Sequence, residues 1–205
     1  MNYSKFIQGY WNQYMLIEKE FLKTSLYVTI GNDNFSTYSN AYLKIIVQTG
    51  AEIDNVFKEI CGLSGKKTIG DYVSPILSKY STLTTSSVRI QNSNITIHPF
   101  QGWDIKQPSK SLEWWDKYNS IKHERTLNFK MASLSTSIHI LGALFILLMY
   151  RLNEIYQLDL SAFTNYPEEN ESELFILDGW NIHFRSELMN SPYPIIDDSK
   201  SEELI

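Results

Sequence analysis

The sequence has almost no cysteine and no recognisable set of metal ligands. Its 205 residues include a single cysteine, Cys61, which excludes an intrachain disulfide and a zinc site made of several cysteines. The four histidines form no His-Glu-x-x-His motif and no Cys-His ligand pattern. We therefore predict no metal site and no cofactor.

The sequence also lacks a secretory leader and a nucleotide-binding loop. Its first residues, MNYSKFIQGYWNQY, contain no basic stretch followed by an apolar one, so we expect a cytoplasmic protein. The segment GLSGKKT at 62–68 is not a P-loop, because its first glycine lies too close to the lysines and no strand precedes it. Hydrophobic residues make up 43% of the chain and charged residues 20%, which excludes a chain that is disordered throughout.

Negative charge is concentrated in the last part of the chain. Residues 166–205 hold ten acids and two bases, whereas residues 1–165 hold 16 bases and 13 acids, a net charge of +3. A near-neutral body does not indicate general nucleic-acid binding, and it leaves room for a local basic site. We assign residues 1–158 to a helical body and residues 159–205 to an acidic C-terminal appendage.

Four long segments have the apolar periodicity of helices. They cover approximately residues 4–30, 37–60, 109–129 and 130–152. The connection between the first two is short, so we expect them to pack antiparallel. The last two join with little or no break.

Shorter elements fill the rest of the chain. We expect Asp71 to cap a short helix that ends near Tyr80, and the Ser/Thr-rich stretch 81–87 to be an exposed loop. Alternating apolar residues predict a β-hairpin near 88–98, and Asp178-Gly179 between two apolar runs predicts another near 173–185, before a loose tail. The fold class is thus all-α: an antiparallel up-and-down bundle of four long helices plus one short helix, with two small β-hairpin decorations.

The fourth long helix allows a second interpretation. Residues 131–150 carry no charge and are long enough to span a bilayer. Their first half nevertheless contains four Ser/Thr residues and His139, and the other helices are amphipathic and need an apolar partner. We favour a buried core helix without membrane contact, and a membrane-associated protein with a span at 131–150 is the alternative.

Polar residues interrupt the apolar faces of three helices. Glu18 and Glu52 fall within the apolar stripes of the first two helices. The third helix adds an amide, a histidine and two cations: Asn119, His123, Lys122 and Arg125. Because an unpaired buried carboxylate is costly, we expect the two glutamates to contact this segment. The cluster is either a structural network that fixes helix register or an active or ligand-binding site.

Three further histidines lie elsewhere in the sequence. We expect His139 to be a satisfied core group, and its approach to His123 across the bundle is the alternative. His98 and His183 fall on polar phases of the predicted strands and are assigned no role.

The order of these residues resembles that of the HEPN superfamily. Tyr38-Ser39 opens the second helix, Glu52 lies near its end, and the motif Trp114-Trp115-x-x-Tyr118-Asn119-x-x-Lys122-His123-x-Arg125 leads into the apolar final helix. The resemblance covers roughly residues 4–152. It implies a small helical bundle, often dimeric, of the kind found in toxin–antitoxin and phage-defence systems.

In catalytic members, the resemblance implies a metal-independent endoribonuclease. A histidine acts as the general acid or base and an arginine holds the scissile phosphate. His123 matches that histidine and Asn119 the polar residue, but Tyr118 stands where the arginine would be. A phenol has no permanent positive charge, so Lys122 or Arg125 would have to supply it, although Arg125 points about 200° away from His123 on a continuous helix.

We therefore expect a non-enzymatic or degenerate HEPN-like interaction module. It would be a homodimer with a protein, RNA or nucleotide partner, in phage defence or a toxin–antitoxin type system. An endoribonuclease that uses His123 is the alternative.

Overall fold

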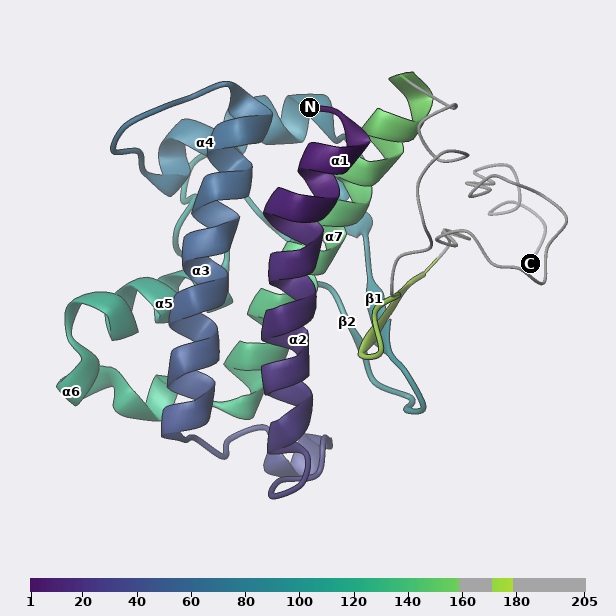
Figure 1. Cartoon of the computed structure of the whole chain (residues 1–205). Coiled ribbons are helices and arrows are strands. Elements are labelled where there is room, and N and C mark those ends of the chain that lie inside the picture. Colours follow the sequence, from purple (N-terminus) through teal and green to yellow (C-terminus); the bar gives the residue numbers. More distant parts are fainter. Residues whose placement is uncertain (159–170, 179–205) are drawn as a thin grey trace, which may run out of the picture.

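The computed structural model describes residues 1–158 and 171–178 (Figure 1). The described part is mostly helical, with one small three-stranded antiparallel sheet. The strand order is β2 (Thr96–Ile97), β1 (Val88–Ile90), β3 (Phe175–Leu177). Helices α5 (Glu113–His123) and α6 (Arg125–Asn128) lie on one side of the long helices in Figure 1, and the sheet lies on the other.

The N-terminal helix is shorter than its apolar periodicity predicts. It runs through α1 (Tyr3–Phe6), a π-helical segment (Ile7–Trp11) and α2 (Asn12–Thr24), and it does not continue to residue 30. The hydroxyls of Thr24 and Ser25 donate to the carbonyls of the last turn, at Phe21 and Leu22, and so compete with helix continuation. Leu26, which extends the periodic pattern, is 79% exposed.

Helix α3 (Asn40–Cys61) agrees closely with the prediction. The Ser39 hydroxyl accepts the Tyr42 N–H at 3.1 Å at its N-terminus, and Gly62 ends it with a left-handed φ of 64°. It runs antiparallel to α2, as expected, and packs against both α2 and α7 (Figure 1).

The short helix α4 (Ile69–Lys79) begins with a capping box. Thr68 is the N-cap, and the Asp71 carboxylate, three residues on, accepts the Thr68 N–H at 2.7 Å. Asp71 is therefore the reciprocal partner of the cap and not the cap itself. The predicted exposed loop at 81–87 contains a short 3₁₀ turn (Leu83–Thr85) with Leu83 fully buried.

The hairpin near 88–98 is confirmed, and the second predicted hairpin has a different strand partner. Strand β1 (Val88–Ile90) pairs with β2 (Thr96–Ile97) in the register Val88↔Ile97. Strand β3 (Phe175–Leu177) pairs with β1 as well, so both segments share one sheet. The other half of the second hairpin, from residue 179, lies outside the described residues.

The third predicted helix is broken. Helix α5 (Glu113–His123) ends where Glu124 adopts φ −135° and ψ 57°, and the chain continues as α6 (Arg125–Asn128) and a 3₁₀ turn (Phe129–Met131). The Asn128 amide donates to the carbonyls of Ser120 and Glu124, which satisfies the end of α5. The prediction of one helix over 109–129 was wrong because this turn is held by contacts that apolar periodicity does not report.

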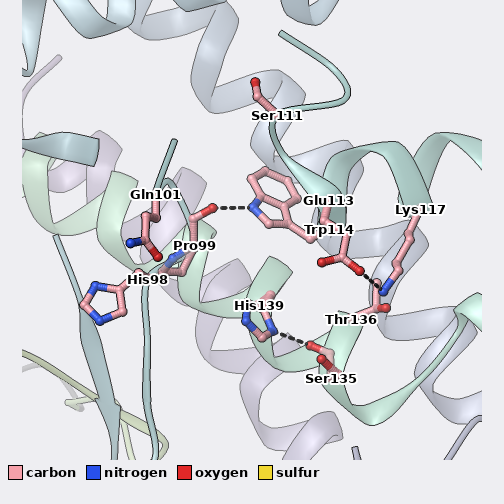
Figure 2. A pocket seen from close by; sticks show the side chains of 10 residues that line it. All are labelled: His98, Pro99, Gln101, Ser111, Glu113, Trp114, Lys117, Ser135, Thr136 and His139. Carbon is pink, nitrogen blue, oxygen red and sulfur yellow. Dashed lines mark hydrogen bonds and ion pairs between the residues drawn. The ribbon is translucent and has the colours of Figure 1, made fainter. Parts of the chain in front are cut away.

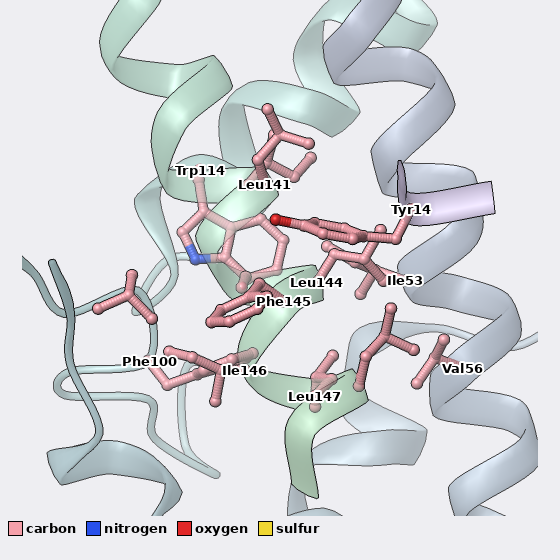
Figure 3. Close-up of a cluster of buried hydrophobic side chains, with 14 of the residues drawn as sticks. Tyr14, Ile53, Val56, Phe100, Trp114, Leu141, Leu144, Phe145, Ile146 and Leu147 are labelled. Carbon is pink, nitrogen blue, oxygen red and sulfur yellow. The ribbon is translucent and has the colours of Figure 1, made fainter. Parts of the chain in front are cut away.

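The fourth long helix, α7 (Leu134–Leu158), forms the centre of the core. It begins four residues later than predicted, where Ser133 accepts the Thr136 N–H at 3.2 Å, and it extends past residue 152. By length and composition this helix could cross a membrane. However, 89% of its most apolar 18-residue stretch is buried inside the protein. Figure 3 shows its Leu144 and Phe145 among aromatic and aliphatic side chains of α2, α3 and α5. This burial favours the core interpretation over the span.

Candidate functional site

An open groove brings together three of the residues predicted for the site. It has a volume of about 680 Å³ and lies between α3 and the end of α5. His123, Lys122 and Arg125 line one side. The other residues are Leu43, Lys44, Val47, Gln48 and Ile121.

The break after α5 explains how Arg125 reaches this groove. On an uninterrupted helix, Arg125 would point about 200° away from His123. The non-helical backbone at Glu124 reorients the chain, so that the last residues of α5 and the first residue of α6 face the same space. The expectation that these two side chains diverge was wrong, because it assumed a continuous helix.

The groove has positive charge and lacks negative charge. Lys44, Lys122 and Arg125 contribute cations, and no carboxylate is among its lining residues. Within residues 1–158 and 171–178, Lys122 and Arg125 have no ion pair, while Lys44 has a loose one with Glu20 at 3.7 Å. The imidazole of His123 is exposed and has no hydrogen-bond partner in that part of the chain. The groove is therefore free to receive an anion.

Tyr118 is a core residue. Its side chain is 3% exposed and its ring lies against Gly50 of α3, where a Cβ atom would come within 2.4 Å of it. The Lys122 ammonium lies 5.4 Å from the centroid of the same ring. This cation–π contact holds Lys122 over Tyr118. Asn119 is half-buried, does not line the groove and makes no side-chain hydrogen bond to a described residue.

The two glutamates predicted to join this cluster lie elsewhere. Glu18 is 1% exposed and accepts hydrogen bonds from the Tyr14 hydroxyl, the Ser172 hydroxyl (2.5 Å) and the Glu173 N–H (2.7 Å). Burial raises the pKa of Glu18, and these hydrogen bonds oppose the shift. The predicted contact with the third helix was wrong, because two of the three donors come from a segment about 155 residues away in sequence and the third, Tyr14, lies one turn earlier on α2.

Glu52 is half-buried on α3, and burial likewise raises its pKa. No hydrogen bond or ion pair links it to α5 in the described part of the chain. Glu52 therefore does not belong to the groove either.

A second pocket was not predicted from the sequence. It has a volume of about 250 Å³ and lies between the loop after β2, the start of α5 and the start of α7 (Figure 2). Its residues are His98, Pro99, Gln101, Ser111, Glu113, Trp114, Lys117, Ser135, Thr136 and His139. His139 thus shares a cavity with His98 and not with His123.

His139 has a defined hydrogen bond in this pocket. Its Nδ1 lies 2.8 Å from the Ser135 carbonyl oxygen, which can only accept. Burial lowers the pKa of His139, opposed by that hydrogen bond and by the nearby Glu113 carboxylate. The expectation of a satisfied core histidine holds for one ring nitrogen, and the other is left for the pocket.

No family model, no curated protein and no solved structure matches this chain. Among the described residues, no three His, Cys, Asp or Glu side chains are grouped so that they could hold a metal ion.

Proposed function

We propose that this protein is a HEPN-like interaction module that binds the phosphate groups of RNA or a nucleotide in the groove beside His123. In this proposal the long helices form the up-and-down bundle of that superfamily, and the protein acts in the cytoplasm. The observation that carries it is the grouping of Lys44, Lys122 and Arg125 around His123 with no carboxylate in the lining.

The groove suits a phosphate backbone for electrostatic reasons. Phosphate contacts by Lys and Arg release counterions and supply most of the affinity in sequence-independent binding. Arg125 can hold two phosphate oxygens with its planar guanidinium, whereas Lys122 and Lys44 act as point charges. Apolar side chains of Leu43, Val47 and Ile121 also line the groove and give the sugar and base a surface without competing acceptors.

Charge-reversal variants test this binding. Lys122→Glu and Arg125→Glu should each weaken binding of a fluorescent single-stranded RNA roughly tenfold and flatten the dependence of log K on log salt by about 0.7 per lost contact. Lys66→Glu is the matched control, because Lys66 is equally exposed and lies outside the groove. Equal losses for all three variants in an anisotropy titration would mean that only net charge matters, and the groove proposal would fail.

RNA cleavage is the second candidate, supported by the free imidazole of His123 beside these cations. His123 would take the proton of a ribose 2′-hydroxyl, whose oxygen attacks the adjacent phosphorus, and the departing 5′-oxygen would receive a proton from water. The products would be a 2′,3′-cyclic phosphate and a 5′-hydroxyl. Cleavage that persists in EDTA and is abolished by His123→Ala supports this form, and unchanged cleavage by that variant removes it.

Self-association is the third part of the proposal. Leu127, on the turn after the groove, is 81% exposed, and Tyr38 is 44% exposed. We propose a homodimer that covers part of this surface, as in the family that the sequence resembles. Sedimentation velocity should give a dimer for the wild type and a monomer for Leu127→Glu. A wild-type monomer at the highest attainable concentration would contradict the proposed homodimer.

Involvement in phage defence or a toxin–antitoxin type system would follow if expression slows growth and His123→Ala relieves the effect.

A further inference from the structure

The pocket beside His139 contains polar groups that the fold does not use. His98 and Gln101 have no side-chain hydrogen bond to any residue in 1–158 or 171–178. Both lie at the exposed side of the pocket, on the loop between β2 and α5. In Figure 2 the imidazole of His139 stands between this loop and the start of α7. The pocket therefore has hydrogen-bonding capacity on two sides.

The hydrogen bond of His139 fixes its tautomer. Because the Ser135 carbonyl can only accept, Nδ1 carries the proton, and Nε2 of the neutral ring is an unprotonated acceptor. A lowered pKa keeps the ring neutral at pH 7. The pocket thus presents one nitrogen acceptor in a fixed position.

The other walls carry no net charge. The Glu113 carboxylate and the Lys117 ammonium lie 2.5 Å apart and neutralise each other. The indole N–H of Trp114 donates a hydrogen bond to the Pro99 carbonyl at 2.7 Å. Trp114 therefore contributes only aromatic surface to the pocket. Because the only cation in the lining is paired, this pocket does not favour an anion, whereas the groove beside His123 does.

Size restricts the ligand further. A cavity of about 250 Å³ lies below the ~300–1,000 Å³ of pockets for drug-sized ligands, so it holds one small ring system. A zwitterionic amino acid could be held through its two charges only if the ion pair between Glu113 and Lys117 were broken. A neutral planar heterocycle needs no such change, because it can pack against the indole and form hydrogen bonds along one edge.

We propose that this pocket binds an amino-substituted nucleobase, adenine or cytosine, either as the free base or as the base of a nucleoside whose ribose stays outside the cavity. The exocyclic amine donates to Nε2 of His139, and the adjacent ring nitrogen accepts from the Gln101 amide. The site is independent of the groove beside His123, because no residue lines both.

The test uses adenosine as the probe and ¹⁵N-histidine-labelled full-length protein. Saturable binding at millimolar concentration should shift the His139 Nε2 resonance without protonating it. Gln101→Ala, on an exposed loop and therefore no threat to folding, should weaken binding by roughly threefold to tenfold, as expected for one net hydrogen bond. His139→Ala should abolish binding, with Lys66→Glu as the control that binds like wild type.

Two comparison ligands sharpen the result. Inorganic phosphate and glycine should leave the His139 resonance unchanged. Absence of saturable adenosine binding, or adenosine affinity unaffected by both Gln101→Ala and His139→Ala, would overturn the proposal. RNA affinity that is unchanged in Lys122→Glu and Arg125→Glu, with adenosine binding intact, would refute only the proposed function, so the two failures are distinguishable.

Discussion

Gly50 and Tyr118 show how a single missing side chain decides the packing of α5 on α3. A Cβ atom on Gly50 would lie 2.4 to 2.6 Å from three ring atoms of Tyr118, closer than any real contact. The ring is buried, so it cannot swing into solvent. Tyr118 thus serves packing, and the positive charge of the groove comes from Lys44, Lys122 and Arg125.

Gly50→Ala should therefore destabilise the protein by about 1–3 kcal/mol, as overpacking does, despite the better helix propensity of alanine. Chemical denaturation measures this change. Gly9→Ala is the matched control, because a Cβ there meets nothing within 4 Å, and it should be neutral or stabilising by up to about 1 kcal/mol. Recovery of stability in Gly50→Ala/Tyr118→Leu would identify the ring as the cause, and a neutral Gly50→Ala would refute the close approach.

Glu18 gives the stability a pH dependence whose sign is fixed by burial. Its pKa in the folded protein is raised above the ordinary 4.5, so the folded state holds this proton to higher pH than the unfolded state. The favourable contribution of Glu18 to the free energy of unfolding is therefore complete below pH 4.5. It is lost as the pH rises through the pKa of Glu18 in the folded protein. Glu18→Gln does not titrate, so the wild type should lose free energy of unfolding relative to this variant as pH rises above 4.5. Parallel denaturation curves at a series of pH values measure the difference, and a constant difference would contradict the raised pKa.

At the scale of single elements, helices are easier to predict than their ends. Apolar periodicity placed a helix within each of the four predicted segments, because each helix buries one apolar stripe, but the third segment is broken after His123. It missed the stop after Thr24, where hydroxyls bond to carbonyls, and the turn at Glu124, which an amide four residues later stabilises. These are local hydrogen bonds of single polar side chains, and a hydrophobic pattern carries no information about them.

The turn after α5 can be tested directly. Asn128→Ala removes the hydrogen bonds to the Ser120 and Glu124 carbonyls and should destabilise the protein by about 1 kcal/mol. Since the turn aims Arg125 into the groove, RNA affinity should fall as well. Thr126→Ala, an exposed change in the same short helix, is the control. Lost stability with unchanged RNA affinity would separate the turn from the groove.

At the scale of the whole molecule, contacts between segments far apart in the chain could not be predicted from the sequence. The groove could be predicted in part, because His123, Lys122 and Arg125 are neighbours in sequence, whereas Lys44 comes from another helix and was missed. The pocket beside His139 draws on three separate segments, and Glu18 finds its partners beyond residue 170. The apolar run before Asp178-Gly179 predicted a strand at 175–177 but did not reveal that β1 would pair with it.

The segment 171–178 should accordingly be essential to the core although it lies far from the other elements in sequence. Leu174, Phe175 and Leu177 are at most 4% exposed, and each such side chain contributes roughly 1.5–3 kcal/mol through burial. Its removal also takes two of the three hydrogen-bond donors from the buried Glu18 carboxylate. A chain that ends at Leu158 should therefore be several kcal/mol less stable than one that ends at Asp178.

Both chains lack residues 179–205, so their comparison measures the effect of residues 159–178 together. Phe175→Ala in the full chain provides an independent check and should cost about 3–5 kcal/mol. Denaturant midpoints measure all three. The groove draws its lining from α3, α5 and α6, so any folded fraction of the shorter chain should still bind RNA. Equal unfolding free energies for the two truncated chains would mean that the strand adds nothing to the core, and the sheet order β2-β1-β3 would have to be revised.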